Sequence, residues 1–345
     1  MATLKDIAKE AGVTEMTVSN VLNGKIKGVR GDSAKRAEKI RKIARRLGYR
    51  PSAAARAMAT GRFNAIGLLQ SPDKPGFFAS NPMAQLTMLR LLGQRDLQLV
   101  SATVTEQAFK ENNLPRMLRE WSVDGYLVDL PETLNGPAYK YLDQGKVPLV
   151  SVHDHDPLLS VSLHEEQGGR LAVERMVLAR RSNLAYFGPP VKHNGRNTGP
   201  ERRLIGLQAA AAEQNLPEFQ IHSPTSSHAH ITSDDRLKAA RCLLKQNNRP
   251  DGIVVASYAY AYTLLLAAAK EGLNVPKDVG LLCFSQTEVT ASGVKVDTLQ
   301  VSAEEWTEQA IRLLLDRIDG VEMPGRDESQ LIPYTYHRGD TLNAS

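Results

Sequence analysis

The stretch LKDIAKEAGVTEMTVSNVLN, Leu4–Asn23, predicts two short helices joined by a tight turn. In its first half, four apolar residues recur at i, i+3, i+4 and i+7 and so share one helix face: Leu4, Ile7, Ala8 and Ala11. Thr3 precedes this run and Asp6 follows three residues later, a spacing typical of a capping box. Gly12 supplies the turn, because glycine adopts positive φ angles without a steric penalty.

The second predicted helix has an outward face of mostly short polar side chains. Thr14 can cap its first turn. Val18, Val21 and Leu22 form its inward face. The residues that must then point outward are Glu15, Met16, Thr17, Ser19 and Asn20. Such a face suits the major groove of DNA, where short polar groups contact base edges and phosphates. A helical hairpin with an ordinary polar exterior is the alternative.

The charge of the chain is divided unequally between its beginning and the rest. Residues 1–62 contain 15 Lys/Arg and 5 Asp/Glu, a balance of +10, while the whole chain carries a net charge of +5. The remainder is therefore mildly acidic, with a balance of −5. A basic head on an acidic body is expected of a nucleic-acid-binding protein. The basic residues do not form one face of an amphipathic helix with Trp or Phe, which disfavours a membrane surface as the partner.

A third helix and a short fourth one complete the beginning of the chain. The third is expected to start near Asp32 and to stop at Gly48, and its apolar stripe is Ala37, Ile40, Ala44 and Leu47. Arg50-Pro51 then breaks the chain, and Ser52–Ala59 has strong helix propensity but is too short to be stable alone. We expect this segment to become ordered only against a partner.

After Phe63 the pattern changes to short apolar strands that alternate with helices. Strands are predicted at Ala65–Leu69, Gln98–Val104, Tyr126–Asp129, Pro148–Val152, Asn183–Phe187, Gly252–Ala256 and Val279–Phe284. This alternation predicts parallel sheets with right-handed crossovers, and Asp156-Pro157 is a natural divide between two of them. We therefore expect an all-α helix-turn-helix headpiece (residues 1–48), a hinge (49–61) and an α/β core (62–345). The core would have two doubly wound parallel-sheet lobes, at about 62–157 with 287–318 and about 158–286 with 319–345.

These motifs resemble the LacI/GalR family of bacterial transcription regulators. The resemblance begins with Leu4–Asn23 and continues through Leu47-Gly48-Tyr49-Arg50-Pro51 and Ala54-Ala55-Arg56 into the core, where Asp251-Gly252 and Val275-Pro276 are two of several shorter signatures. It implies a homodimeric regulator, expected to be a repressor, whose headpieces bind a near-palindromic DNA operator. It also implies a core like that of periplasmic sugar-binding proteins, with a small-molecule effector, a sugar or related metabolite, in its cleft.

The resemblance implies a set of DNA contacts. These are Thr3, Lys5, Thr14, Glu15, Met16, Thr17, Ser19, Asn20, Asn23, Tyr49, Ser52, Ala55 and Met58. Glu15 and Met16 occupy the positions that carry most base specificity in the family. Asn20 stands where the family usually has Arg, so we expect adenine rather than guanine to be favoured at that position. Ala55 and Met58 fall where two hinge helices insert into the minor groove, and Met replaces the usual Leu wedge.

The expected effector contacts are Phe77, Phe78, Asp154, Arg203, Ser257, Tyr258, Ser285 and Gln286. Asp154 and Arg203 match cleft positions of the family, and both suit a polyhydroxyl ligand or one with a carboxylate or phosphate. The alternative for Arg203 is a structural salt bridge between the lobes. Ser257-Tyr258 and Ser285-Gln286 replace an Asn/Asp pair and acidic residues of the family. The ligand is then less hydroxylated, or aromatic rings stack on it, or the response to ligand has been lost.

Other features bear on the remaining protein classes. The segments His153-Asp154-His155-Asp156 and His228-Ala229-His230 are expected to be polar loops rather than metal sites. No nucleotide-binding or nucleophile motif is present, so we expect no cofactor and no enzyme. The alternatives are a ligand-independent DNA-binding regulator, or a small-molecule enzyme with a DNA-binding head. Cys242 and Cys283 lie in apolar or helical runs, which favours a reducing cytoplasm. The family resemblance implies that this is the bacterial cytoplasm, with the protein associated with the nucleoid.

The sequence also bears on membranes and assembly. No window of about 18 apolar residues is present, and the charged N-terminus predicts a helix rather than a signal peptide, so we expect no membrane partner. No heptad-like tail follows Tyr336, which favours a dimer over a tetramer.

Overall fold

The computed structural model consists of two units, Met1–Asn64 and Ala65–Ser345. The structure describes residues 2–23, 32–73, 76–111, 113–120, 122–130, 141–142, 144, 147–152, 159–191, 198–225, 231–291, 293–321 and 330–343. In this part of the chain, none of the helices combines the length and the apolar character needed to cross a membrane.

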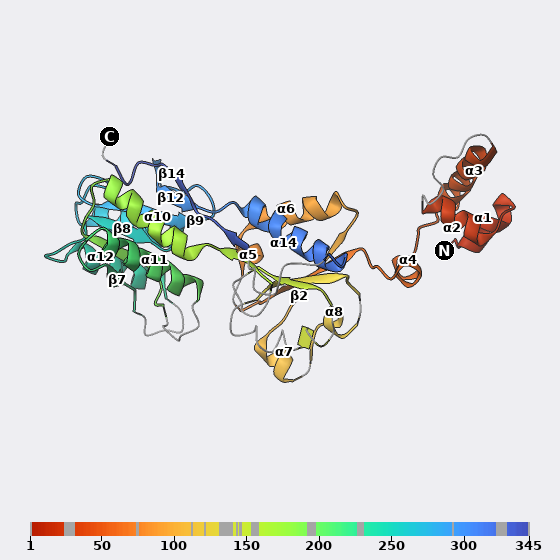
Figure 1. Cartoon of the computed structure of the whole chain (residues 1–345), viewed down its shortest axis with the longest axis horizontal. Coiled ribbons are helices and arrows are strands. Elements are labelled where there is room, and N and C mark those ends of the chain that lie inside the picture. The colour runs from red at the N-terminus through yellow and green to blue at the C-terminus, as the bar shows by residue number, and fades with distance from the viewer. Residues whose placement is uncertain are drawn as a thin grey trace. The chain divides into compact units, whose positions relative to one another are not determined.

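The first unit is helical, as the sequence predicts. Its helices are α1 (Leu4–Ala11), α2 (Glu15–Leu22), α3 (Asp32–Arg46) and α4 (Ala53–Thr60) (Figure 1). The capping box of Thr3 and Asp6 begins α1, and Gly12 ends it at a φ of 72°. Three helices pack around Ile7, Val18 and Ile40, none of which is exposed to solvent.

The buried stripe of α3 differs from the expected one by one residue. Ile43 is buried together with Ala37, Ile40 and Ala44, whereas Leu47 lies beyond the end of the helix and is exposed. The position i+3 after Ile40 therefore faces the core, and the position i+7 does not, because the helix ends at Arg46. Tyr49 packs against the same cluster, as expected.

Helix α4 forms the end of the first unit. The Ser52 hydroxyl accepts a hydrogen bond from the Ala55 amide at 3.3 Å, and Gly61 closes the helix in a left-handed conformation. That α4 becomes ordered only against a partner stays a prediction.

The second unit begins with a four-stranded parallel sheet of order β2-β1-β3-β4. Its strands are β1 (Ala65–Gln70), β2 (Gln98–Thr103), β3 (Gly125–Asp129) and β4 (Leu149–Ser151). The helices of this region are α5 (Phe77–Ser80), α6 (Pro82–Gly93), α7 (Glu106–Lys110), α8 (Arg116–Arg119) and α14 (Ala303–Ile318). Helix α14 packs on α6 and on strands β3 and β4.

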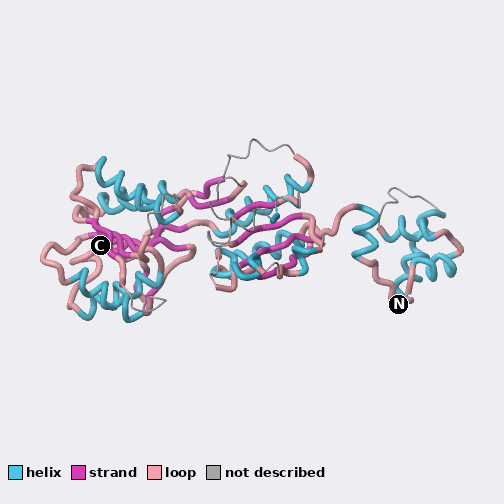
Figure 2. Tube along the Cα trace, turned by 90° about the horizontal axis from the view of Figure 1, so that it is seen from below, coloured by secondary structure: helices cyan, strands magenta, loops and turns pink. Residues whose placement is uncertain are grey.

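A six-stranded sheet of order β14-β12-β9-β8-β6-β7 forms the second lobe, and of these strands β14 alone is antiparallel to its neighbour. Figure 2 draws the strands of both sheets in magenta. Its strands are β6 (Leu184–Phe187), β7 (Gln220–His222), β8 (Gly252–Val255), β9 (Gly280–Ser285), β12 (Asp297–Gln300) and β14 (Thr335–His337). Its helices are α10 (Glu165–Leu178), α11 (Gly199–Glu213), α12 (Ser233–Leu244) and α13 (Tyr258–Lys270). The expected two doubly wound sheets are confirmed.

A short parallel pair, β5 (Val161–Leu163) with β13 (Gln330–Ile332), lies on the connections between the two sheets. Strand β5 leads from β4 into α10, and β13 leads from α14 into β14. A small hairpin of β10 (Thr290–Ala291) and β11 (Val294–Lys295) precedes β12. Because β12 pairs with β9 and β14, residues 297–300 belong to the second sheet, whereas the sequence analysis placed 287–318 in the first lobe. The rest of the lobe boundaries remains a proposal.

Candidate functional site

The outward face of α2 combines one exposed apolar side chain with polar groups that hold one another in place. Glu15 is exposed, and Met16 has 74% of its surface exposed. The hydroxyls of Thr14 and Thr17 lie 3.0 Å apart, and the Asn23 amide donates to the Ser19 hydroxyl at 3.1 Å. Asn20 is half-buried on the same helix. Four of the predicted DNA contacts, Thr14, Thr17, Ser19 and Asn23, are therefore held by short-range hydrogen bonds on this helix and its caps.

Two further predicted DNA contacts lie at the start of α1. The Thr3 amide and hydroxyl both donate to the Asp6 carboxylate at 2.8 Å. These hydrogen bonds hold the pKa of Asp6 below its usual value. Lys5, in the first turn of the helix, is exposed. Thr3 thus fixes the helix start, and its side chain is already engaged with Asp6.

The hinge helix α4 presents an apolar side chain to solvent. Met58 has 90% of its surface exposed, the highest fraction among the large apolar side chains that the structure describes. Ala55 is exposed as well, whereas Ala57 between them is buried. Ser52 caps the helix, so its hydroxyl has a structural role. Ala55 and Met58, both exposed, are the residues that the sequence analysis places in the minor groove.

Phe77 and Phe78, predicted to offer ring faces to a ligand, are both buried. The ring of Phe77 stacks on Trp306 of α14, with centroids 3.7 Å apart, so one of its faces is covered. The Asp129 carboxylate, at the end of β3, accepts hydrogen bonds from the amides of Phe77 and Phe78 at 2.7 and 2.9 Å. A Cβ at Gly76 would collide with this carboxylate, so glycine is required there. Asp129 and Trp306 thus fix α5, and sequence analysis did not single out this role for either residue.

Gln286 connects the second sheet with the first lobe. The Asn81 amide donates to its side-chain oxygen at 3.0 Å, while the Asn81 oxygen caps α6 through the amides of Met83 and Ala84. Ser285 and Ser257 are half-buried near the carboxyl ends of β9 and β8. Tyr258 is exposed and lies edge-on to Tyr262, one turn further along α13. Asp154 lies outside the described residues.

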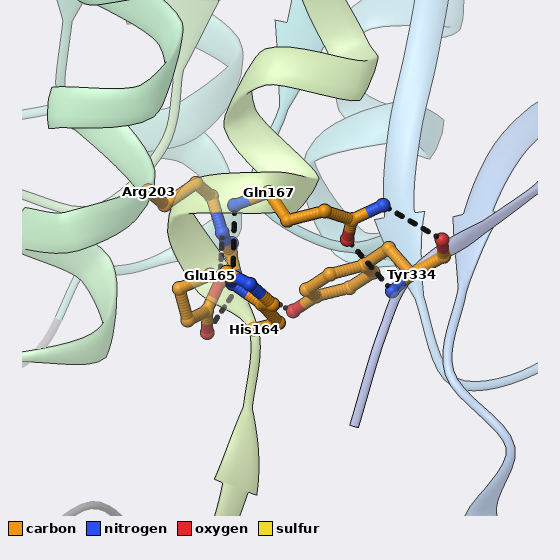
Figure 3. A network of polar contacts seen from close by, with 5 residues as sticks. All are labelled: His164, Glu165, Gln167, Arg203 and Tyr334. Carbon is orange, nitrogen blue, oxygen red and sulfur yellow. Dashed lines mark hydrogen bonds and ion pairs between the residues drawn. The ribbon is translucent and has the colours of Figure 1, made fainter. Parts of the chain in front are cut away.

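Arg203 is bound by the chain itself (Figure 3). Its Nε donates to Glu165 Oε2 at 2.7 Å and its Nη2 donates to Glu165 Oε1 at 2.9 Å. Nη2 also donates to the Tyr334 hydroxyl at 3.0 Å, and the guanidinium lies 4.1 Å above the ring of Phe284. The side chains of Arg203 and Glu165 are only 11% and 8% exposed. The ion pair lies within the second lobe, between α10 and α11, and not between the lobes.

Burial and charge set the protonation of this network. Burial by itself would lower the pKa of Arg203, but the facing Glu165 carboxylate outweighs it and raises that pKa well above its usual value. Burial raises the pKa of the Tyr334 hydroxyl, so it stays protonated at neutral pH. Burial also raises the pKa of the Cys283 thiol to about 12, which leaves it a poor nucleophile.

Metal ligation finds no support in the described residues. Within them, no three His, Cys, Asp or Glu side chains form a group that could hold a metal ion. The two histidine-rich segments, 153–156 and 228–230, lie outside the described residues. Their expected loop character stays a prediction.

Two family models match the chain. The model described as "Bacterial regulatory proteins, lacI family" matches residues 3–52, and that of a periplasmic binding protein-like domain matches residues 158–342. Catabolite control protein A of Priestia megaterium is 25% identical over 295 residues, 84% of this chain and 83% of that protein. The ribose operon repressor of Halalkalibacterium halodurans is 27% identical over 332 residues, 92% and 91% of the two chains.

Solved structures of two regulators share the fold. The lac repressor dimer bound to operator and the anti-inducer ONPF has a TM-score of 0.77 at 21% identity, covering 99% of both chains. The transcriptional regulator CelR in complex with cellobiose has a TM-score of 0.62 at 21% identity, covering 99% of this chain and all of that one. At these identities, the likeness supports the fold alone.

Proposed function

The chain belongs to the lacI family of bacterial regulatory proteins, and we propose that it represses transcription by binding a near-palindromic operator as a homodimer. The observation that supports this most directly is the outward face of α2, with exposed Glu15 and Met16 on a helix whose opposite face is buried. A helix of this size fits the major groove. The two-fold symmetry of a dimer would be mirrored in the operator.

Base specificity resides mainly in three side chains of α2. Met16 makes apolar contact with base edges, such as the methyl group of thymine. Glu15 can accept a hydrogen bond from cytosine, and Asn20 can bind adenine with two hydrogen bonds. The remaining members of the set contact phosphates or fix the helix: Thr3, Lys5, Thr14, Thr17, Ser19, Asn23 and Tyr49.

The hinge helix binds at the centre of the operator. Met58 and Ala55 lie exposed on α4, and Ser52 begins the helix. Inserting an apolar side chain between base pairs costs the free energy of unstacking them. The larger area that bent DNA presents to the protein offsets this cost. Met58, flexible and apolar, is suited to this role.

Dimer contacts come in part from α6. This helix exposes Met83, Leu86 and Leu89 and buries Met88 and Leu92 against the core. Apolar side chains gathered on one exposed face indicate a protein surface that is covered in an assembly.

The core binds a small-molecule effector, a sugar or related metabolite. Ligands of open α/β sheets bind outside the carboxyl ends of the strands, where Ser257 and Ser285 lie. Gln286 and Asp154 complete the polar part of the proposed site. Tyr258 supplies an exposed ring, and Arg203 lies at the edge of the site. Phe77 and Phe78, whose rings are buried, support the site from the core rather than stack on the ligand.

The relatives named above regulate genes, and we infer that this chain likewise acts without catalysing a reaction and works in the cytoplasm, where the chromosome lies. Among the described residues, the buried thiol of Cys283 is not a candidate nucleophile, because its pKa lies far above neutral.

Footprinting with the full chain on DNA upstream of its own gene tests the proposal. At physiological salt we expect a protected near-palindrome. Asn20→Ala should weaken this protection, because a base contact is lost, while Glu38→Gln on the exposed side of α3 should preserve it. Absence of any protected site for the wild-type chain, at a salt concentration that abolishes non-specific binding, would refute it.

A further inference from the structure

Arg203 occupies a place where a ligand is expected in this type of fold. It lies in the second turn of α11, and its guanidinium covers Phe284, close to the carboxyl end of the parallel strand β9. In open α/β sheets, ligands bind outside the carboxyl ends of the strands. A guanidinium at this edge is suited to a carboxylate or phosphate, because its planar fork can donate two parallel hydrogen bonds to either group.

Glu165 already occupies this fork. Its two carboxylate oxygens accept from Nε and Nη2 of Arg203 at 2.7 and 2.9 Å, the arrangement that an acidic ligand would adopt. The Tyr334 hydroxyl accepts from Nη2 and donates to Glu165 Oε2 at 3.1 Å. The three side chains form a closed ring of hydrogen bonds, with Arg203 and Tyr334 converging on Glu165 (Figure 3).

The backbone around the ring holds it in this arrangement. The side-chain amide of Gln167 binds Tyr334 twice, donating to its carbonyl at 3.3 Å and accepting from its amide at 3.0 Å. A Cβ at Gly168 would lie 2.5 Å from the Tyr334 ring, so glycine lets that ring pack on α10. Glu165 itself is in the first turn of α10, directly after β5. Tyr334 and Glu165 are therefore both fixed at the ends of the two connecting strands.

We propose that Glu165 determines ligand specificity by occupying Arg203 as an internal acidic group, so that the core selects uncharged effectors and rejects carboxylates and phosphates. This rests on the proposed function, in which the core binds a small effector. An acidic ligand would have to displace Glu165 and would leave a second carboxylate buried beside it. An uncharged ligand leaves the pair intact and can use Ser257, Ser285 and Gln286 instead.

Replacement of Glu165 by glutamine should let the guanidinium of Arg203 bind anions. Gln keeps the shape of the side chain but supplies one acceptor oxygen in place of two and removes the charge. The matched control is Glu166→Gln. Glu166 is the next residue of α10, its side chain is 46% exposed, and its oxygen lies 3.5 Å from Arg170. Both variants change the net charge equally, but only Glu165→Gln changes the side chain that is hydrogen-bonded to Arg203.

The measurement is thermal unfolding of the full chain in inorganic phosphate and in sodium chloride of equal ionic strength. Phosphate also binds basic surfaces such as the headpiece, so the comparison is the phosphate-minus-chloride shift of each variant. We expect this shift to be equal in the wild type and E166Q, and about 3 °C or more larger in E165Q. The double variant E165Q/R203M should return to the wild-type shift, because the anion-binding group is gone.

Two results would overturn the proposal. One is a phosphate shift in E165Q no larger than in E166Q. The other is a phosphate shift of the wild type that decreases in R203M, because Arg203 would then bind anions despite Glu165. If E165Q does not fold in either salt, the wild type and R203M decide the matter: equal shifts support the proposal and unequal shifts refute it. Footprinting of the wild type and E166Q tests operator binding separately, so a failure there is distinguishable from a failure here.

Discussion

The headpiece and the second lobe present their candidate binding residues in opposite ways. On α2 and α4, Met16 and Met58 are 74% and 90% exposed, although both are apolar. In the second lobe, Arg203 is charged, yet its side chain is only 11% exposed and is bound to Glu165. Exposed apolar groups are stabilised when a partner covers them. A buried charge must already have its partner within the chain.

The headpiece and the second lobe therefore determine their binding specificity in different ways. The headpiece exposes side chains that a nucleic acid can contact. Its DNA specificity therefore depends on which side chains are exposed. In the second lobe, Glu165 already binds the guanidinium of Arg203. Ligand specificity there depends also on the acidic ligands that Glu165 excludes. Specificity by exclusion is as much a property of a binding site as specificity by attraction.

The largest expected effect of a single substitution is on the buried ion pair. Glu165→Gln should lower the free energy of unfolding by about 3–5 kcal/mol, because Arg203 would remain buried without its counter-charge. Equilibrium unfolding in urea, followed by tryptophan fluorescence, measures it. Glu166→Gln should change stability by less than about 0.5 kcal/mol. A similar small effect for both variants would mean that the pair is not held in solution as the structure shows it.

The next effect is in the first lobe, where Asp129 holds the start of α5. Asp129→Ala removes the acceptor for the amides of Phe77 and Phe78 and should cost about 2–3 kcal/mol. The same urea titration measures this, with Asp73→Ala as the exposed control. Equal stability of D129A and D73A would contradict a role for Asp129 in fixing the two phenylalanines.

A smaller effect is expected in the headpiece, which is stabilised by local caps. Thr3→Ala removes the capping oxygen of α1 and should cost about 1 kcal/mol. Because the headpiece and the core are separate units, this loss should appear in the helical signal at 222 nm and leave the unfolding of the core unchanged. Lys5→Ala, in the same turn, should leave the headpiece transition in place. A shift of the core transition in T3A would show that the two units unfold together.

The smallest effect is the acid sensitivity of the same cap. The pKa of Asp6 is lowered in the folded headpiece by its hydrogen bonds with Thr3. Its contribution to stability is therefore fully present above the unfolded pKa of about 3.9 and is lost as the pH falls through the folded value. Carbon-13 NMR of the carboxyl group should show a titration midpoint below that of a model peptide. In T3A the midpoint should move up, and an unchanged midpoint would remove Thr3 as the cause.

The headpiece could be predicted in detail because its signals are local. The Thr3–Asp6 box, the turn at Gly12 and the inward Val18 and Val21 are all determined by residues three or four positions apart. The alternation of strands and helices likewise indicated two parallel sheets. Leu47 was misjudged, because helical periodicity does not give the exact end of α3.

The contacts of the core could not be predicted, because they join residues that are distant in the sequence. Glu165 and Arg203 are 38 residues apart, and their pairing requires the close approach of α10 and α11. Gly169 and Gly206 allow that approach, because a Cβ at either would collide with backbone of the other helix. Tyr334 is further still in the sequence, and the β5–β13 pairing together with Gln167 brings it to the pair. The sequence analysis proposed Arg203 as an effector contact, and no local pattern indicated Glu165 as its partner.

Recognition of DNA sequence by the exposed face of α2 is tested most directly by selecting bound sequences from a random DNA library. The full chain and its Asn20→Arg variant are compared at the same physiological salt. We predict that the wild type enriches a near-palindrome. In the variant, guanine should replace adenine at one symmetric pair of positions, a discrimination of about 1–3 kcal/mol per contact. Enrichment of the same sequence by both proteins, or a uniform gain of affinity for all DNA by the variant, would contradict the claim.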